Sequence, residues 1–306
     1  MGGIPELVLN SGKKIPVLGF GTAASPLPPP EVLESSIIDA IELGYRHFDT
    51  ASVYGTEATL GRAISEALRR GLVSCREELF ITSKLWCTDA DHDLAVPALN
   101  RTLKALGLEY LDLYLIHWPV RLKGEMELFL GFKEENIMPF DVKGTWLGME
   151  ECQRLGLTRS IGVSNFSVEE LSELVTHATI PPAVNQVEMH PYWQQRELRD
   201  FCAKNRGIQV SAYSPLGGKG TFWGSNMILD SKDIEQIAEA KGKSTAQVCL
   251  RWAFQQGVSF IAKSFNEGRM KENMDIFQWN LDENDLEKMS RIPQQKMSAG
   301  SQFERK

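Results

Sequence analysis

The chain has few of the features that mark exported, membrane-spanning or nucleic-acid-binding proteins. Its first residues, MGGIPELVLN, carry neither the basic nor the apolar segment of a secretory signal, and no run approaches the ~18 apolar residues of a membrane span. The five cysteines form no CxxC pair that would indicate zinc or redox work. Acidic residues exceed basic ones by 40 to 33, which disfavours a nucleic-acid or anionic-lipid partner. We expect a cytoplasmic protein in a reducing compartment, with neither a membrane nor a nucleic-acid partner.

The composition is that of a folded globular protein, with 42% hydrophobic and 24% charged residues. A length of 306 residues could hold two average domains, but α/β barrels run to ~250 residues as one domain. No shift in composition marks a linker. We therefore expect a single domain over residues 1–306, present as a monomer.

Short apolar runs alternate with amphipathic helical stretches along the chain. Before residue 17, two short runs flank Ser11-Gly12, which predicts a β-hairpin. Eight apolar runs follow, each succeeded by a stretch with apolar residues three and four apart: residues 17–21, 45–49, 78–84, 111–118, 158–165, 183–188, 208–214 and 258–264. This alternation predicts the α/β class, and eight units predict a (β/α)8 TIM barrel.

Two segments interrupt the rhythm, residues 119–144 after the fourth strand and residues 215–230 after the seventh. Loops of this length in a compact domain are usually functional. Both leave the C-terminal end of a strand, which is the barrel face where active sites form. We expect binding loops at these two places.

Residues 19–24, GFGTAA, match the G-x-G-x-x-G/A dinucleotide fingerprint and follow a predicted strand. The fingerprint needs a helix that starts at once, because the helix N-terminus holds the pyrophosphate. Here the chain continues SPLPPP, which cannot form that helix. The Rossmann interpretation is therefore rejected.

Three consecutive predicted strands end on ionisable residues: Asp49, Lys84 and His117. Taken singly, each would more often be a solvated or structural residue. Because parallel barrel strands bring their C-terminal ends to one rim, we expect the three side chains around one spot. Tyr54 follows Asp49 by five residues in a short turn and can reach the same mouth.

This group suits proton transfer to an oxygen. A free tyrosine has a pKa of ~10, and a nearby Lys84 ammonium would lower that pKa. Asp49 would pair with Lys84 and keep it charged, and His117 could hydrogen-bond a substrate oxygen. A tyrosine acid fits protonation of an oxygen as hydride reaches the adjacent carbon. Since no side chain gives hydride, a nicotinamide cofactor is implied.

A metal-dependent barrel hydrolase is the least supported alternative. The five histidines, at positions 47, 92, 117, 177 and 190, show no HxH or HExxH ligand pairing. We expect no metal site.

The chain resembles the aldo-keto reductases along essentially its whole length. The resemblance rests on GYRHFDTASVYGTEATLGRAI, ITSKLW, LDLYLIHWP, IGVSNF and IAKSFNEGRMKEN. The segments MEECQRLGLTRSIGVSNFS, VNQVEMHP and KSFNEGRMKENMDIF are similar to the plant branch that includes chalcone (polyketide) reductase, codeinone reductase, methylecgonone reductase and deoxymugineic acid synthase. The resemblance implies an NADPH-dependent reductase that converts a ketone or aldehyde to an alcohol, with Tyr54 as proton donor. The expected substrate is a bulky plant specialised metabolite.

The resemblance also assigns roles residue by residue. The family's tetrad falls on Asp49, Tyr54, Lys84 and His117 without a substitution. The nicotinamide carboxamide contacts fall on Ser164, Asn165 and Gln186, the stacking aromatic on Tyr213, the pyrophosphate path on Ser214 and Leu216, and the nicotinamide ribose contacts on Thr22 and Asp49. The 2′-phosphate site falls on Lys263, Ser264, Asn266 and Arg269, and the adenine contacts on Glu272 and Asn273. Charge-assisted bonds from Lys263 and Arg269 would favour NADPH over NADH.

Three features depart from the family pattern. Ala262 stands where Pro is usual before the cofactor-binding lysine, and the tail after Ile292 is shorter than in relatives, where it closes over the substrate. Ala23 stands where many members carry Trp, which should admit a bulkier substrate. The substrate pocket is expected to draw on Ala23, Trp86, Trp118, Phe129, Phe132 and Trp223.

Two other functions fit the same fold. One is reduction of an activated C=C bond, as in the steroid 5β-reductase branch, where Glu replaces the tetrad His. His117 argues against this function. The other is a non-catalytic, cofactor-binding regulatory subunit, against which the complete tetrad argues.

Overall fold

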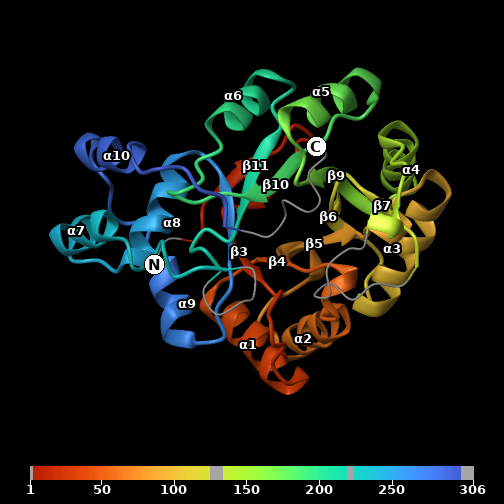
Figure 1. Ribbon diagram of the computed structural model, residues 1–306. Helices are drawn as coiled ribbons and strands as arrows, with labels where there is room; N and C mark the ends of the chain where they lie inside the picture. Colours follow the sequence, from red (N-terminus) through yellow and green to blue (C-terminus); the bar gives the residue numbers. More distant parts are fainter. Residues whose placement is uncertain (1–2, 125–133, 219–223, 298–306) are drawn as a thin grey trace.

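The computed structural model describes residues 3–124, 134–218 and 224–297, and a closed barrel of parallel strands forms its centre (Figure 1). The strands run around the barrel in chain order: β3 (Leu18–Gly21), β4 (His47–Asp49), β5 (Phe80–Leu85), β6 (Leu111–Ile116), β9 (Thr158–Ser164), β10 (Val184–Glu188), β11 (Gln209–Tyr213) and β12 (Ser259–Ala262). β12 pairs with β3 and closes the ring. The eight predicted strands and the TIM barrel are confirmed.

Helices form the outer layer around the barrel (Figure 1). They are α1 (Pro30–Leu43), α2 (Glu57–Arg70), α3 (His92–Leu106), α4 (Val142–Arg154), α5 (Val168–His177), α6 (Arg196–Lys204), α7 (Lys232–Lys241), α8 (Thr245–Gln255), α9 (Glu267–Met274) and α10 (Glu283–Ser290). Short 3-10 helices occur at η1 (Ser52–Tyr54), η2 (Arg76–Glu78), η3 (Cys87–Asp89) and η4 (Glu134–Asn136). The sequence predicted one helix after each strand, so α7 and α10 are additional helices that were not predicted. None of the helices in the described part is long and apolar enough to cross a membrane.

The predicted N-terminal hairpin is present as β1 (Glu6–Val8) paired antiparallel with β2 (Lys14–Pro16). Leu9 and Ile15 of this hairpin pack against Phe80 and Val184, the first residues of β5 and β10. The hairpin therefore covers the N-terminal end of the barrel. The opposite, C-terminal end is where the ionisable strand ends lie.

The glycines of the rejected dinucleotide fingerprint have a packing role. A Cβ on Gly19 would lie 2.6 Å from Ile261 Cδ1 and 2.8 Å from His47 Nδ1, and a Cβ on Gly21 would lie 2.8 Å from Ile261 Cγ2. The next helix, α1, does not begin until Pro30. These glycines let β3 lie close to its neighbours β4 and β12, and they do not open a helix that could hold a pyrophosphate.

Each of the two long segments leaves the C-terminal end of a strand, as expected. The first contains β7 (Arg121–Leu122), which pairs antiparallel with β8 (Ile137–Met138), and it ends earlier than residue 144 because α4 begins at Val142. The second begins after β11 and leads to α7. Three predicted substrate contacts, Phe129, Phe132 and Trp223, lie outside the described residues.

Candidate active site

The four residues of the predicted tetrad meet at the C-terminal mouth of the barrel. Asp49 ends β4, Lys84 lies on β5, His117 directly follows β6, and Tyr54 ends η1. Lys84 Nζ lies 2.6 Å from Asp49 Oδ1, and Tyr54 Oη lies 3.3 Å from His117 Nε2. Lys84 Nζ also lies 5.0 Å from the centroid of the Tyr54 ring. Strand ends from different parts of the chain thus form one contiguous group.

The Lys84 ammonium is buried and held by two acceptors. Its Nζ donates to Asp49 Oδ1 and, at 2.9 Å, to the main-chain oxygen of Thr50. Burial lowers the pKa of Lys84, and the Asp49 carboxylate opposes that shift. The second carboxylate oxygen of Asp49 accepts a bond from Gln186 Nε2 at 2.8 Å. Asp49 is therefore fixed on both oxygens and supplies the counterion of Lys84.

His117 is held in its neutral form. Burial lowers its pKa well below the usual value, and the Lys84 ammonium adds to the effect. Its Nε2 faces Tyr54, whereas its buried Nδ1 has no hydrogen-bond partner in the described part of the chain. The ring of Trp86 lies edge-on to the imidazole, with centroids 5.1 Å apart. A neutral imidazole with its proton on Nε2 can donate that proton in a hydrogen bond to an oxygen in the mouth.

The pKa of Tyr54 differs from the expectation. Burial of the hydroxyl raises it well above the usual value, and the Asp49 carboxylate raises it further. The expected lowering by Lys84 is wrong for this structure, because Asp49 neutralises the ammonium at 2.6 Å while the phenol pays the desolvation penalty of forming an anion. Tyr54 is therefore protonated at neutral pH and holds a proton that it releases only to a strongly basic oxygen.

The residues assigned to the nicotinamide form a hydrogen-bonded group beside His117. Tyr213 Oη donates to Asn165 Oδ1 at 2.9 Å, and Asn165 Nδ2 donates to the main-chain oxygen of His117 at 3.0 Å and to Ser164 Oγ at 3.1 Å. Ser164 Oγ donates to the main-chain oxygen of Gln186 at 2.8 Å. The group links the ends of β9, β10 and β11 to the tetrad. A nicotinamide ring bound beside it could therefore contact both this group and the tetrad.

Thr22, Ser214 and Leu216 also lie at this end of the barrel. Thr22 follows β3, and its Oγ1 donates to the main-chain oxygen of Asp49 at 3.1 Å. Ser214 and Leu216 directly follow β11, with Ser214 in the left-handed region at a φ of 49°. Their predicted contacts to ribose and pyrophosphate stay predictions.

A pair of cations lies near the start of α9. Partial burial and the neighbouring Arg269 guanidinium lower the pKa of Lys263. Neither cation forms an ion pair with a carboxylate within the described residues. Asn266 caps α9 by accepting a bond from Arg269 N at 3.0 Å, and Ser264 precedes it, buried. Unneutralised cations beside a helix N-terminus suit a phosphate, so this cluster fits the 2′-phosphate of NADPH.

The two residues predicted at the adenine differ in their surroundings. Glu272 is exposed, whereas Asn273 is buried and hydrogen-bonds the hydroxyl of Tyr45. Ala262, where the family usually has Pro, is a buried residue at the end of β12.

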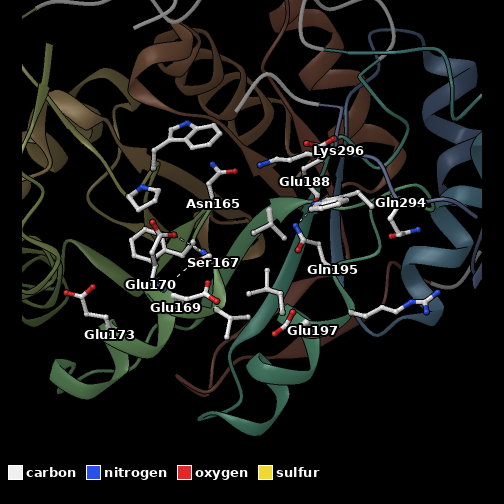
Figure 2. A pocket seen from close by; sticks show the side chains of 18 of the residues that line it. Asn165, Ser167, Glu169, Glu170, Glu173, Glu188, Gln195, Glu197, Gln294 and Lys296 are labelled. Atoms are coloured by element: carbon white, nitrogen blue, oxygen red, sulfur yellow. Dashed lines mark hydrogen bonds between the residues drawn. The ribbon is translucent and has the colours of Figure 1, made fainter. Parts of the chain in front are cut away.

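The described substrate-side residues lie around the same mouth. Ala23 is half-buried directly after Thr22, Trp86 is buried against His117, and Trp118 is half-buried. A cavity of about 840 Å³ has Trp118 and Asn165 among its lining residues, whereas none of the four tetrad residues lines it. Figure 2 shows it between the side chains of α5 and α6, with several carboxylates along its edge.

Two contributors were not predicted from the sequence. Thr50 acts through its main-chain oxygen, a group present in every residue, so no sequence signal could identify it. Thr56 bonds the side chains of Thr22 and Thr50, although its position before α2 is typical of a helix cap. Within the described residues, no group of three or more His, Cys, Asp or Glu side chains could hold a metal ion.

Comparisons with known proteins show the family of the chain. Residues 17–293 match the Aldo/keto reductase family. "Protein REDOX 2" of Catharanthus roseus is 52% identical over 301 residues, covering 98% of this chain and 93% of that protein. "NADPH-dependent codeinone reductase 1-4" of Papaver somniferum is 54% identical over 297 residues, covering 97% and 92%. "Deoxymugineic acid synthase 1" of Zea mays is 53% identical over 289 residues, covering 94% and 91%.

A solved structure of similar shape is the Bombyx mori aldo-keto reductase in complex with NADP. It has a TM-score of 0.88 and 36% sequence identity, and the match covers 98% of this chain and 97% of that one. The family match, the identity to the relatives and the shared fold agree, and the chain belongs to the aldo/keto reductase family.

Proposed function

We propose that this protein reduces a ketone or aldehyde to an alcohol with NADPH, and that Tyr54 donates the proton. As a member of the aldo/keto reductase family, the chain is an NADP-dependent oxidoreductase. One observation carries the mechanistic proposal: Tyr54 Oη and His117 Nε2 lie 3.3 Å apart and face the same space at the barrel mouth. A carbonyl oxygen placed there could receive hydrogen bonds from both groups.

NADPH, when bound, supplies the hydride that adds to the carbonyl carbon. Neutral His117 donates an Nε2–H bond to the carbonyl oxygen and polarises the C=O bond. As negative charge develops on that oxygen, it becomes basic enough to take the proton of Tyr54, whose raised pKa keeps it protonated until then. The resulting phenolate lies beside the Lys84 ammonium and regains a proton from solvent.

The residues assigned to the cofactor support NADPH rather than NADH. Lys263 and Arg269 would hold the 2′-phosphate, which NADH lacks. Tyr213, Ser164, Asn165 and Gln186 would hold the nicotinamide end, because they adjoin His117 through the hydrogen bonds of Asn165. The nicotinamide group lies at the C-terminal ends of β9, β10 and β11. Lys263 directly follows β12, which is the next strand around the barrel.

We propose a bulky substrate of plant specialised metabolism. Ala23 leaves space where many family members place Trp. Curated relatives include the plant reductase "NADPH-dependent codeinone reductase 1-4" of Papaver somniferum. His117 favours carbonyl over C=C reduction. A single-domain monomer in the cytoplasm completes the proposal, and light scattering after size-exclusion chromatography tests the monomer.

The test is NADPH consumption, followed by absorbance, with bulky cyclic ketones, small aldehydes and enones, combined with mass analysis of each product. We expect alcohols from the carbonyl compounds and faster turnover with NADPH than with NADH. A saturated product that keeps its carbonyl group would instead support a C=C reductase. Tight NADPH binding without consumption across the whole panel would support a non-catalytic subunit.

A further inference from the structure

We propose that Thr56 is a positioning residue, which fixes the acceptors of Lys84 through a chain of three buried hydroxyls; this inference rests on the function proposed above. The threonine chain consists of Thr50, Thr56 and Thr22. Thr22 and Thr50 are 0% exposed and Thr56 is 1% exposed. Thr56 Oγ1 lies 2.8 Å from Thr22 Oγ1 and 2.8 Å from Thr50 Oγ1, so it joins the other two.

The direction of every bond in the threonine chain follows from its end. Thr22 Oγ1 donates to the main-chain oxygen of Asp49, which can only accept. Each hydroxyl has one proton to donate, so Thr56 must donate to Thr22, and Thr50 must donate to Thr56. The chain therefore runs one way, from Thr50 through Thr56 and Thr22 to the Asp49 carbonyl. Removing the middle hydroxyl leaves Thr50 without an acceptor and Thr22 without a donor.

Thr56 gives up the usual role of its position to make these bonds. It is the N-cap of α2, where a threonine hydroxyl normally accepts a bond from a main-chain N–H in the first turn. No such side-chain bond exists at α2, whereas Ser167 at the N-cap of α5 accepts from Glu170 N and completes a capping box. The hydroxyl of Thr56 is thus committed to Thr22 and Thr50 instead of to the helix.

The threonine chain acts on the segment that carries both acceptors of Lys84. These are Asp49 Oδ1 and the main-chain oxygen of Thr50, on adjacent residues. Thr22 binds the Asp49 carbonyl with its N–H at 3.0 Å as well as with its hydroxyl. Thr56 ties this segment to the start of α2, so the two ends of the loop that holds Tyr54 are joined. Loss of the Thr56 hydroxyl should loosen Tyr54 and Lys84 relative to each other, and small misplacements of catalytic groups slow reactions strongly.

The test compares Thr56→Val, which keeps the shape, with Thr56→Ser, which keeps the hydroxyl. For Thr56→Val we expect kcat for a reducible carbonyl compound to fall about tenfold, the equivalent of one neutral hydrogen bond, with KM within about twofold of wild type. Thr56→Ser should restore kcat to within about twofold. The matched control is Thr145→Val, because Thr145 is 1% exposed and its hydroxyl has no partner in the described residues. It should behave as wild type.

Wild-type kcat in Thr56→Val would overturn the proposal, and so would a Thr56→Ser variant as slow as Thr56→Val, which would implicate side-chain shape. If Thr56→Val does not fold, Thr50→Val removes the donor end and leaves Thr56 bonded to Thr22. It should lower kcat similarly, and unchanged kcat would equally contradict the threonine chain. A wild-type protein that reduces no carbonyl compound would contradict the proposed function itself, whereas an active wild type with insensitive variants contradicts only the role of Thr56.

Discussion

Replacement of Asp49 by Asn removes one charge from a buried ion pair and nearly preserves its shape. The side chains of Lys84 and Asp49 are 1% and 6% exposed, and their charged atoms lie 2.6 Å apart. At an effective dielectric constant of about 20, this distance gives a Coulomb attraction of about 6 kcal/mol, which offsets a desolvation penalty of several kcal/mol per ion. In Asp49→Asn the penalty for Lys84 is no longer offset. We expect the free energy of unfolding to fall by about 3–5 kcal/mol at neutral pH.

The stability lost in Asp49→Asn should depend on pH, because it arises from the charge of Lys84. Burial lowers the pKa of folded Lys84, and loss of the Asp49 carboxylate should lower it further. Between that value and the unfolded pKa of ~10.4, the unfolded chain binds more protons than the folded one, so stability rises with pH. The deficit of Asp49→Asn should therefore be largest near neutral pH and should shrink toward about pH 9.5.

The assay is urea unfolding followed by tryptophan fluorescence at both pH values. The control is Glu6→Gln, because the Lys14–Glu6 pair has side chains 65% and 46% exposed, and its loss should change stability by less than about 1 kcal/mol. An Asp49→Asn variant as stable as wild type at both pH values would refute the reasoning. A deficit that grows with pH would refute the linkage argument.

Other residues give independent tests. Lys263→Ala and Arg269→Ala should each raise the Kd for NADPH about tenfold or more and that for NADH little, as measured by fluorescence quenching; equal losses would place neither side chain at the 2′-phosphate. Burial lowers the pKa of His47 to about 4, so the unfolded chain takes up a proton first as pH falls. The free energy of unfolding should drop by about 3 kcal/mol between about pH 6.5 and about pH 4, and urea titrations of His47→Asn should show a correspondingly shallower fall, an unchanged slope being the contrary result. Ala23→Trp should raise KM for bulky ketones and leave small aldehydes near wild type; an equal effect on both would mean that Ala23 does not border the substrate.

The barrel and the tetrad were predictable because each rests on periodicity. Apolar runs mark the strands, and a parallel barrel brings the ends of consecutive strands to one rim, so Asp49, Lys84 and His117 had to lie close together. α7 has the same spacing of buried residues, at Ile234, Ile237 and Ala238, so periodicity could have identified it as well. The expectation of one helix per strand left it out.

The direction of the Tyr54 pKa shift was not predictable, because burial and the Lys84 ammonium act on that pKa in opposite directions. The sequence places an ammonium near Tyr54, but whether that charge outweighs burial depends on how closely Asp49 neutralises it, and here burial prevails. Similarly, Thr56 precedes a helix and is expected to cap it. Only the folded arrangement of Thr22 and Thr50 shows that its hydroxyl is used at the site.

Turnover by Tyr54→Phe tests the central claim most directly. The change removes one hydroxyl and keeps the ring beside Lys84. The control is Tyr110→Phe, at a ring that contacts Arg76 and Arg159 rather than the tetrad. If Tyr54 is the proton donor, its loss should lower kcat for carbonyl reduction by about 10²-fold or more, with the Kd for NADPH nearly unchanged and Tyr110→Phe as active as wild type. A Tyr54→Phe protein that reduces the same carbonyl compound at the wild-type rate would contradict the account.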